Sequence, residues 1–171
     1  MAHQRKIGDA CIPCSLKGSK TKMTKRINNI SVGNAGEYFV AGELERHGFS
    51  VAVPMSNVEL FDILAFERAT HKQIAIQVKT THGQKREWTL SAKNELIADK
   101  NVYYIFVMLN EMKTPEYFIV PSCTVANDIH ASHARWLSSP GKQGQPHKDN
   151  SIRKFQDIDG TYKDRWDLLS K

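Results

Sequence analysis

The sequence predicts an α/β fold in which a mixed central β-sheet is flanked by helices. Three patterns support this prediction. Apolar residues recur with helical spacing in 37–44, polar and apolar side chains alternate along 73–80, and residues 102–109 form a nearly continuous apolar run. These patterns are typical of an amphipathic helix, a half-buried strand and a strand buried on both faces.

The composition is that of one globular domain. The chain has 171 residues, of which 40% are hydrophobic and 25% charged. No apolar run approaches the roughly 20 residues of a membrane span, and the N-terminus shows no apolar secretion signal. Three cysteines do not suggest a disulfide framework. We therefore expect a cytoplasmic protein without a membrane partner.

The net charge of +6 is unevenly distributed. Residues 1–26 hold seven Lys/Arg and one acid, whereas the other 145 residues hold 17 basic and 17 acidic groups. Within that neutral body, residues 135–154 contain five basic side chains and only Asp149 as an acid. Two basic segments suit a polyanion partner. A solubilising tail and a solvated loop are the alternative interpretation.

The chain divides into a basic flexible tail, residues 1–32, and a single domain, residues 33–171. The tail is polar and lacks periodicity. It contains Cys11 and Cys14, which make half of a structural zinc site without a second ligand pair. Zinc binding there is therefore not our main expectation.

The first helix is predicted to follow the glycine-containing segment 33–36 and to run to His47. Its apolar stripe contains Glu37 together with Val40, Ala41 and Leu44. Burying a lone carboxylate is costly unless it is paired or binds a cation. Alternatively, Glu37 lies at the helix start, where the helix dipole favours a solvated negative charge. The glycines also permit close approach of a ligand such as phosphate.

A strand over 49–54 and a β-hairpin made of 61–67 and 73–80 come next. The hairpin carries Asp62 on its first strand, and on its second strand Gln77 and Lys79 share one face. Two residues that alternate on a strand lie roughly 7 Å apart. An acid, an amide and a lysine at one place exceed what a core requires.

These residues resemble a nuclease motif. The pattern D-x(14)-Q-x-K, formed by Asp62, Gln77 and Lys79, is similar to the PD-(D/E)XK signature, with Phe61 in place of the proline and Gln77 in place of the second acid. Together with G-N-A-G-E and E-R-x-G-F-x-V-x-x-P-x-S upstream, residues 33–81 resemble the N-terminal half of archaeal Holliday-junction resolvases and related restriction-type nucleases.

The resemblance implies a restriction-endonuclease-like core with one site lined by Glu37, Ser56, Asp62, Gln77 and Lys79. It implies a metal-dependent endonuclease acting on DNA, and it leaves open whether the substrate is a junction, a flap or a duplex with a specific site. Mg²⁺ or Mn²⁺ would be bound by oxygen atoms of Asp62, Gln77, Glu37 and the Val78 backbone carbonyl. A two-fold symmetric substrate would imply a homodimer.

Two other hypotheses remain open. Because Gln77 removes one acid, the chain could be a catalytically inactive nucleic-acid-binding module that keeps the nuclease fold. In the third hypothesis the strands are plain core and the tail serves solubility, so no salt-dependent nucleic-acid binding is expected.

The downstream half is predicted to contain strands at 87–90, 102–109 and 117–120. Helices are predicted at 91–99 and from Ser122 to about 133. Residues 162–169 are predicted to form a closing helix or an ordered tail anchored by Trp166 and Leu169, and Trp136 is predicted to belong to the core.

Five basic residues are candidate nucleic-acid contacts: Lys93, Lys142, Lys148, Arg153 and Lys154. A solvated lysine is the alternative for Lys93. His130, His133 and His147 are expected to be exposed polar residues rather than metal ligands.

Overall fold

The computed structural model of the chain describes residues 28–55 and 60–170. Its elements, in chain order, are α1 (Asn29–Arg46), β1 (Phe49–Ala52), β2 (Ile63–Glu67), β3 (Gln73–Thr81), β4 (Glu87–Ser91), the 3-10 turn η1 (Ala92–Leu96), β5 (Val102–Met108), β6 (Glu116–Pro121), α2 (Ser122–Ser138), β7 (Ile152–Gln156) and the 3-10 turn η2 (Trp166–Ser170).

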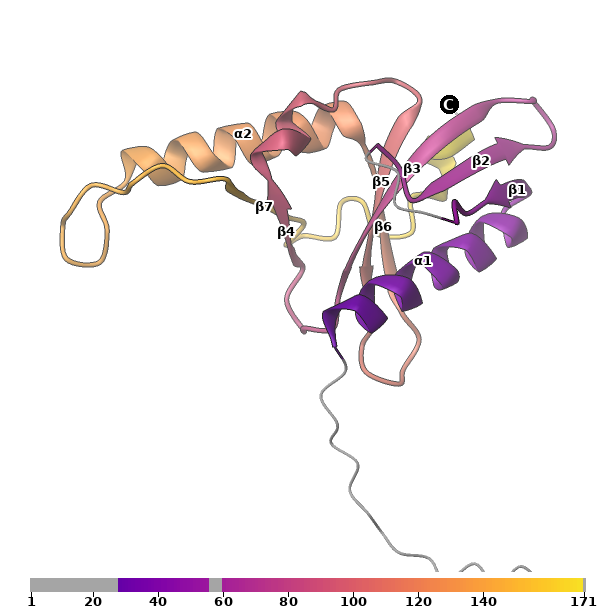
Figure 1. Cartoon of the computed structure of the whole chain (residues 1–171), viewed down its shortest axis with the longest axis horizontal. Coiled ribbons are helices and arrows are strands. Elements are labelled where there is room, and N and C mark those ends of the chain that lie inside the picture. Colours follow the sequence, from indigo (N-terminus) through magenta and orange to yellow (C-terminus); the bar gives the residue numbers. More distant parts are fainter. Residues whose placement is uncertain (1–27, 56–59, 171) are drawn as a thin grey trace, which may run out of the picture.

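Five strands form a mixed sheet in the order β1-β2-β3-β5-β6 (Figure 1). Strand β3 pairs antiparallel with β2 and parallel with β5, and the other two pairings are antiparallel. Strands β4 and β7 form a separate two-stranded sheet. The mixed sheet with flanking helices confirms the predicted fold class.

Helix α1 covers one face of the sheet. Its buried residues Val32, Val40 and Leu44 belong to one core cluster with Ile76 and Val78 of β3. Each large aliphatic side chain that is fully buried contributes about 2 kcal/mol. The alternation predicted for β3 is therefore correct, and the face of Ile76 and Val78 is the one that packs on α1.

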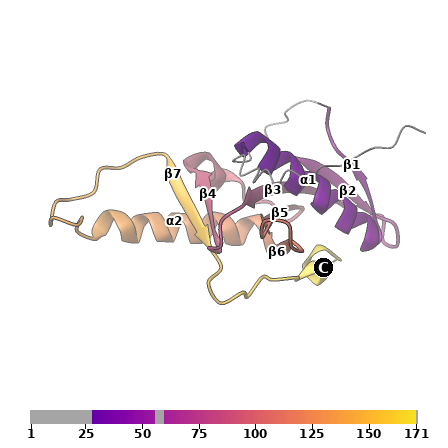
Figure 2. The same cartoon turned by 90° about the horizontal axis from the view of Figure 1, so that it is seen from below.

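The opposite face is covered on its β5–β6 side by α2 and the small sheet, as the two views together show (Figures 1 and 2). Trp88 of β4 packs against Phe106, Phe118 and Phe155. Its indole N–H donates to the Val107 carbonyl at 3.1 Å, which satisfies the one polar atom of this buried side chain.

The start of α1 differs from the prediction. The helix begins at Asn29, and the side chain of Asn28 caps it by accepting the Ser31 N–H at 2.7 Å. Val32 is buried within the helix, so the helix start predicted at the segment 33–36 was wrong. Asn28 is a favourable cap, and tertiary packing outweighs the low helix propensity of the two glycines that follow.

Four further predictions need correction. Residues 92–96 form only a 3-10 turn instead of a helix to residue 99, and α2 continues to Ser138. Strand β7 follows the loop where no strand was predicted. Trp136 is 37% exposed rather than part of the core, and its ring stacks on that of His147 with centroids 4.2 Å apart.

None of the helices in the described part of the chain is both long and apolar enough to pass through a membrane.

Candidate active site

Asp62 stands immediately before β2 and is fixed by two hydrogen bonds to β3. Its N–H donates to the Ile76 carbonyl at 2.8 Å, and its carboxylate Oδ2 accepts the Val78 N–H at 2.7 Å. Ile63 is the residue that pairs with Ile76 in the ladder, so the backbone bond of Asp62 is one residue out of register. The regular ladder ends here, because the Val78 N–H donates to the Asp62 carboxylate instead of to a backbone carbonyl.

Strand β3 contributes Gln77, Val78 and Lys79 beside this carboxylate. Because the N–H and C=O of a strand residue project to the same side, the Val78 carbonyl also lies on the Asp62 side of β3. Gln77 is buried and Lys79 is partly exposed. Among residues 28–55 and 60–170, no acid forms an ion pair with Lys79.

Glu37 lies on α1, and the charges of Asp62 and Lys79 act on its pKa. Burial raises the pKa of Glu37, the negative charge of Asp62 raises this pKa further, and Lys79 acts in the opposite direction. The dipole effect fades beyond the first helical turn, and Glu37 lies eight residues after the first residue of α1. The interpretation of Glu37 as a solvated acid at the helix start is therefore wrong.

Gly36 determines how closely α1 approaches β3. A Cβ added at Gly36 would lie 1.8 Å from the Thr80 Oγ1 atom, which is far inside van der Waals contact. The glycine thus serves packing between helix and strand, instead of the ligand approach that the sequence suggested. Glu37 is therefore the residue that follows the closest approach of α1 to β3.

Tyr104 and Asn94 form a polar contact behind the site that the sequence did not reveal. Tyr104 pairs with Gln77 across β5 and β3, and its hydroxyl accepts the Asn94 amide N–H at 2.9 Å. Burial raises the pKa of Tyr104, and Asp62 raises it as well. Only the parallel register, which is not visible in the apolar run 102–109, brings this tyrosine next to the motif.

The predicted nucleic-acid contacts do not form one group. Lys93, Lys142 and Lys148 are exposed. Lys154 forms an ion pair with Glu87 at 2.7 Å. Arg153 is buried, and its guanidinium binds Glu95 and the Asn150 carbonyl, so its predicted availability for DNA is wrong.

Of the three histidines predicted to be exposed, His130 is exposed, whereas the His133 side chain is only 10% exposed and His147 is partly buried. His130 contacts Glu95 at 3.0 Å and His133 contacts Asp149 at 2.8 Å. In the described ranges, no group of three or more His, Cys, Asp or Glu side chains could hold a metal ion by itself. Ser56, Cys11 and Cys14 lie outside the described residues.

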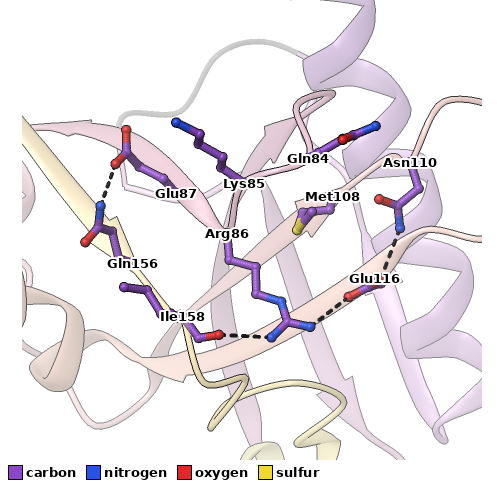
Figure 3. Close-up of a pocket in the computed structure, with 9 residues that line it drawn as sticks. All are labelled: Gln84, Lys85, Arg86, Glu87, Met108, Asn110, Glu116, Gln156 and Ile158. Atoms are coloured by element: carbon purple, nitrogen blue, oxygen red, sulfur yellow. Dashed lines mark hydrogen bonds and ion pairs between the residues drawn. The ribbon is translucent and has the colours of Figure 1, made fainter.

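A pocket of about 600 Å³ lies beyond the end of β3, and none of the predicted site residues lines it (Figure 3). The Arg86 guanidinium donates to the Ile158 carbonyl at 3.2 Å and lies 3.6 Å from the Glu116 carboxylate. On the opposite wall, the Gln156 amide donates to Glu87 at 2.5 Å. Most charged groups that line the pocket are thus already bound to other residues of the protein. The pocket therefore does not replace the Asp62 region as candidate site.

The donors around Asp62 fit a hard divalent cation. Two carboxylates, an amide and a backbone carbonyl supply only oxygen atoms, the ligand type that Mg²⁺ and Mn²⁺ prefer. The effect of Asp62 on the pKa of Glu37 indicates repulsion between two negative charges. A cation between them would relieve that repulsion.

Comparisons with known proteins gave structural matches only. No protein-family model and no curated protein sequence matches the chain. One similar solved structure is Hjc, a Holliday junction resolvase from the archaeal hyperthermophile Archaeoglobus fulgidus, with 16% identity and a TM-score of 0.44 over 73% of this chain and 84% of that one. Another is the bacterial homing endonuclease I-Ssp6803I, with 12% identity and a TM-score of 0.48 over 84% and 92% of the two chains. With both TM-scores below 0.5, the functional argument depends on the residues themselves.

Proposed function

We propose that the chain is a metal-dependent endonuclease that hydrolyses phosphodiester bonds in DNA. The observation that carries this proposal is the position of the Asp62 carboxylate, which stands where the regular β2–β3 ladder ends and is bound to Val78 of the strand that carries Lys79. Glu37 comes from α1 and Asp62 from the position before β2, and the charge of Asp62 raises the pKa of Glu37. Lys79, which has no acid bound to it in the described part of the chain, is available to a phosphate.

Each residue has a distinct chemical role in this proposal. Asp62 and Glu37 hold the cation, together with the oxygens of Gln77 and Val78. The bound Mg²⁺ or Mn²⁺ supplies Lewis-acid activation and charge stabilisation. Lys79 orients the attacking water and stabilises the negative charge that develops on the phosphate oxygens. The Val78 N–H keeps the Asp62 carboxylate in one orientation.

The substitution of Gln77 for a second acid supports one alternative, a DNA-binding module without catalysis. An amide oxygen carries no charge, so the cation is bound less tightly than by a site with a further carboxylate. Glu37 compensates in our proposal because it brings the second negative charge from α1. In the alternative, Glu37 does not compensate for the missing acid, and the protein binds DNA without cutting it.

A panel of labelled DNAs separates the two candidates. Branched, flapped, duplex and single-stranded substrates are incubated with the full chain in Mg²⁺, in Mn²⁺ and in EDTA. We expect cleavage of at least one substrate in either metal and none in EDTA. Binding of DNA without cleavage in both metals would select the inactive module. If the preferred substrate has two-fold symmetry, the proposal extends to a homodimer.

A further inference from the structure

A projecting arm is the most unusual feature of the shape. It comprises residues 130–151, which form the C-terminal part of α2 and the loop that leads to β7. Both views show it reaching beyond the sheet layers, at the end of the molecule away from α1, β1 and β2 (Figures 1 and 2). We call these residues the basic arm.

The loop of the basic arm is held in a specific conformation. The His147 ring stacks on Trp136 of α2, and the His133 imidazole contacts the Asp149 carboxylate at 2.8 Å. Further out, the Gly141 N–H donates to the Gln145 carbonyl at 2.8 Å, next to a bridge between the flanking prolines. Loops of this length inside a domain are usually functional or disordered, and these contacts give this one order.

The exposed charges of the basic arm are almost all positive. Arg135, Lys142 and Lys148 are exposed, and within residues 28–55 and 60–170 none of them forms an ion pair. The single acid, Asp149, is bound by His133, which lowers the pKa of that carboxyl. Elsewhere, Lys154 and Lys163 are neutralised by Glu87 and Glu116. The basic arm therefore keeps its positive charge available for a partner.

The base of the basic arm is joined to the turn that borders the candidate active site. Glu95 of η1 binds Arg153, which follows the arm, and His130, which begins it. The neighbouring residue Asn94 donates to the Tyr104 hydroxyl beside Gln77. One short turn thus contacts the site on one side and the arm on the other.

From this arrangement we propose that the basic arm is a second contact for the phosphate backbone of duplex DNA, held at a fixed position relative to the candidate active site by Glu95. This inference rests on the proposed function, because it assumes that the site acts on DNA. Lysine and arginine contacts to phosphate fix the register of a protein on a duplex without reading its sequence. The DNA must therefore extend beyond the cleavage point far enough to reach the arm.

The test combines arm variants with a series of duplex lengths. Binding is measured in EDTA, so cleavage cannot interfere, on duplexes of about 30 and about 8 base pairs, roughly 100 Å and 27 Å long. The arm variant is Lys142→Ala/Lys148→Ala, and the matched control is Lys100→Ala/Lys113→Ala, which removes two exposed lysines elsewhere. A third variant, Trp136→Ala, removes the stacking partner of His147 but no charge.

We expect the arm variant to bind the long duplex roughly tenfold more weakly than the control, with the slope of log affinity against log salt reduced by about 2. On the short duplex the two should bind alike. Trp136→Ala should weaken binding to the long duplex only. Equal affinities of arm variant and control on the long duplex, or equal losses at both lengths, would overturn the inference.

The outcomes also separate this inference from the proposed function. Length-dependent binding that needs the arm lysines, with no cleavage in Mg²⁺ or Mn²⁺, would support the arm and contradict the nuclease. Cleavage in Mg²⁺ or Mn²⁺, together with equal DNA binding by the arm variant and its control, would support the nuclease and contradict the role of the arm. Absence of DNA binding by the unmodified protein would overturn both.

Discussion

The acids near β3 and those around the small β4–β7 sheet differ in how they are neutralised. Glu87, Glu95 and Glu116 each have a basic partner on another element, and hydrogen bonds from Lys154, Arg153 and Lys163 lower their respective pKa values. Among residues 28–55 and 60–170, Glu37 has no such partner, and burial and Asp62 raise its pKa. Acids that hold the fold are matched internally, whereas the two acids that we propose to bind a cation are not.

The largest expected effect separates catalysis from stability at Asp62. Asp62→Asn should reduce cleavage by about 1,000-fold, because the amide removes the negative charge from the cation site. DNA binding should change little, since DNA affinity depends on basic residues. The measurement is single-turnover cleavage beside DNA binding in EDTA.

The same variant has a built-in stability control. The asparagine carbonyl oxygen can still accept the Val78 N–H, so the free energy of unfolding in urea should change by less than about 1 kcal/mol. A folded Asp62→Asn protein with undiminished cleavage would remove the role assigned to this residue.

The second effect concerns the acids that have a basic partner within the protein. Glu95→Ala should lower the free energy of unfolding by about 3 kcal/mol, because it leaves the buried Arg153 guanidinium without its carboxylate. Lys154→Ala, at the exposed pair with Glu87, should cost less than about 1 kcal/mol. Urea unfolding of both variants measures the difference, and equal losses would argue against a structural role for the Glu95–Arg153 pair.

Glu95 also predicts a dependence of stability on pH. Its pKa is lowered from 4.5 in the folded state, so its contribution is fully present above pH 4.5 and is lost as the pH falls below that value. Between neutral pH and about pH 3, the unmodified protein should therefore lose more stability than Glu95→Gln does. Parallel curves for the two proteins in thermal unfolding would contradict this assignment.

A smaller effect is expected where α1 meets β3. Gly36→Ala should destabilise the fold by about 1–2 kcal/mol, because the new methyl group overlaps Thr80 and only part of this cost is offset by better helix propensity. The double variant Gly36→Ala/Thr80→Ala should recover most of the loss. A double-mutant cycle of unfolding free energies measures the coupling, and simple additivity would show that the two residues do not compete for space.

The smallest effect distinguishes Glu37 from the paired acids. Its raised pKa means that ionisation is less favourable in the folded state, so Glu37 destabilises the fold as the pH rises above 4.5. Glu37→Gln should therefore raise stability at pH 7 by less than about 1 kcal/mol, while cleavage falls. A loss of stability on this substitution would place Glu37 with the structural acids.

The sequence allowed prediction of those parts of the molecule that depend on local periodicity. The alternation in β3 located the shared face of Gln77 and Lys79, and the helical stripe located Val40 and Leu44 in the core. The start of α1 was missed because glycines weaken a helix locally, whereas the Gly36–Thr80 contact that requires one of them is long-range.

The remaining errors have the same physical origin. Arg153 looks like any other cation in a basic segment, and only the pairing of β4 with β7 and the nearby turn reveal its partner Glu95. Trp136 looks like a core residue, yet it serves to stack on a histidine from the following loop. Tyr104 became a neighbour of Gln77 only through the parallel β3–β5 register. Non-local contacts decided each case.

The central claim is that the charges at the end of the β2–β3 ladder perform phosphodiester hydrolysis. The most direct test compares Lys79→Ala with Lys113→Ala, an equal loss of charge at an exposed turn, in Mn²⁺-dependent cleavage of the preferred DNA. The proposal predicts that Lys113→Ala cuts like the unmodified protein and that Lys79→Ala, though folded and DNA-bound, does not. Equal cleavage by the two variants would contradict it.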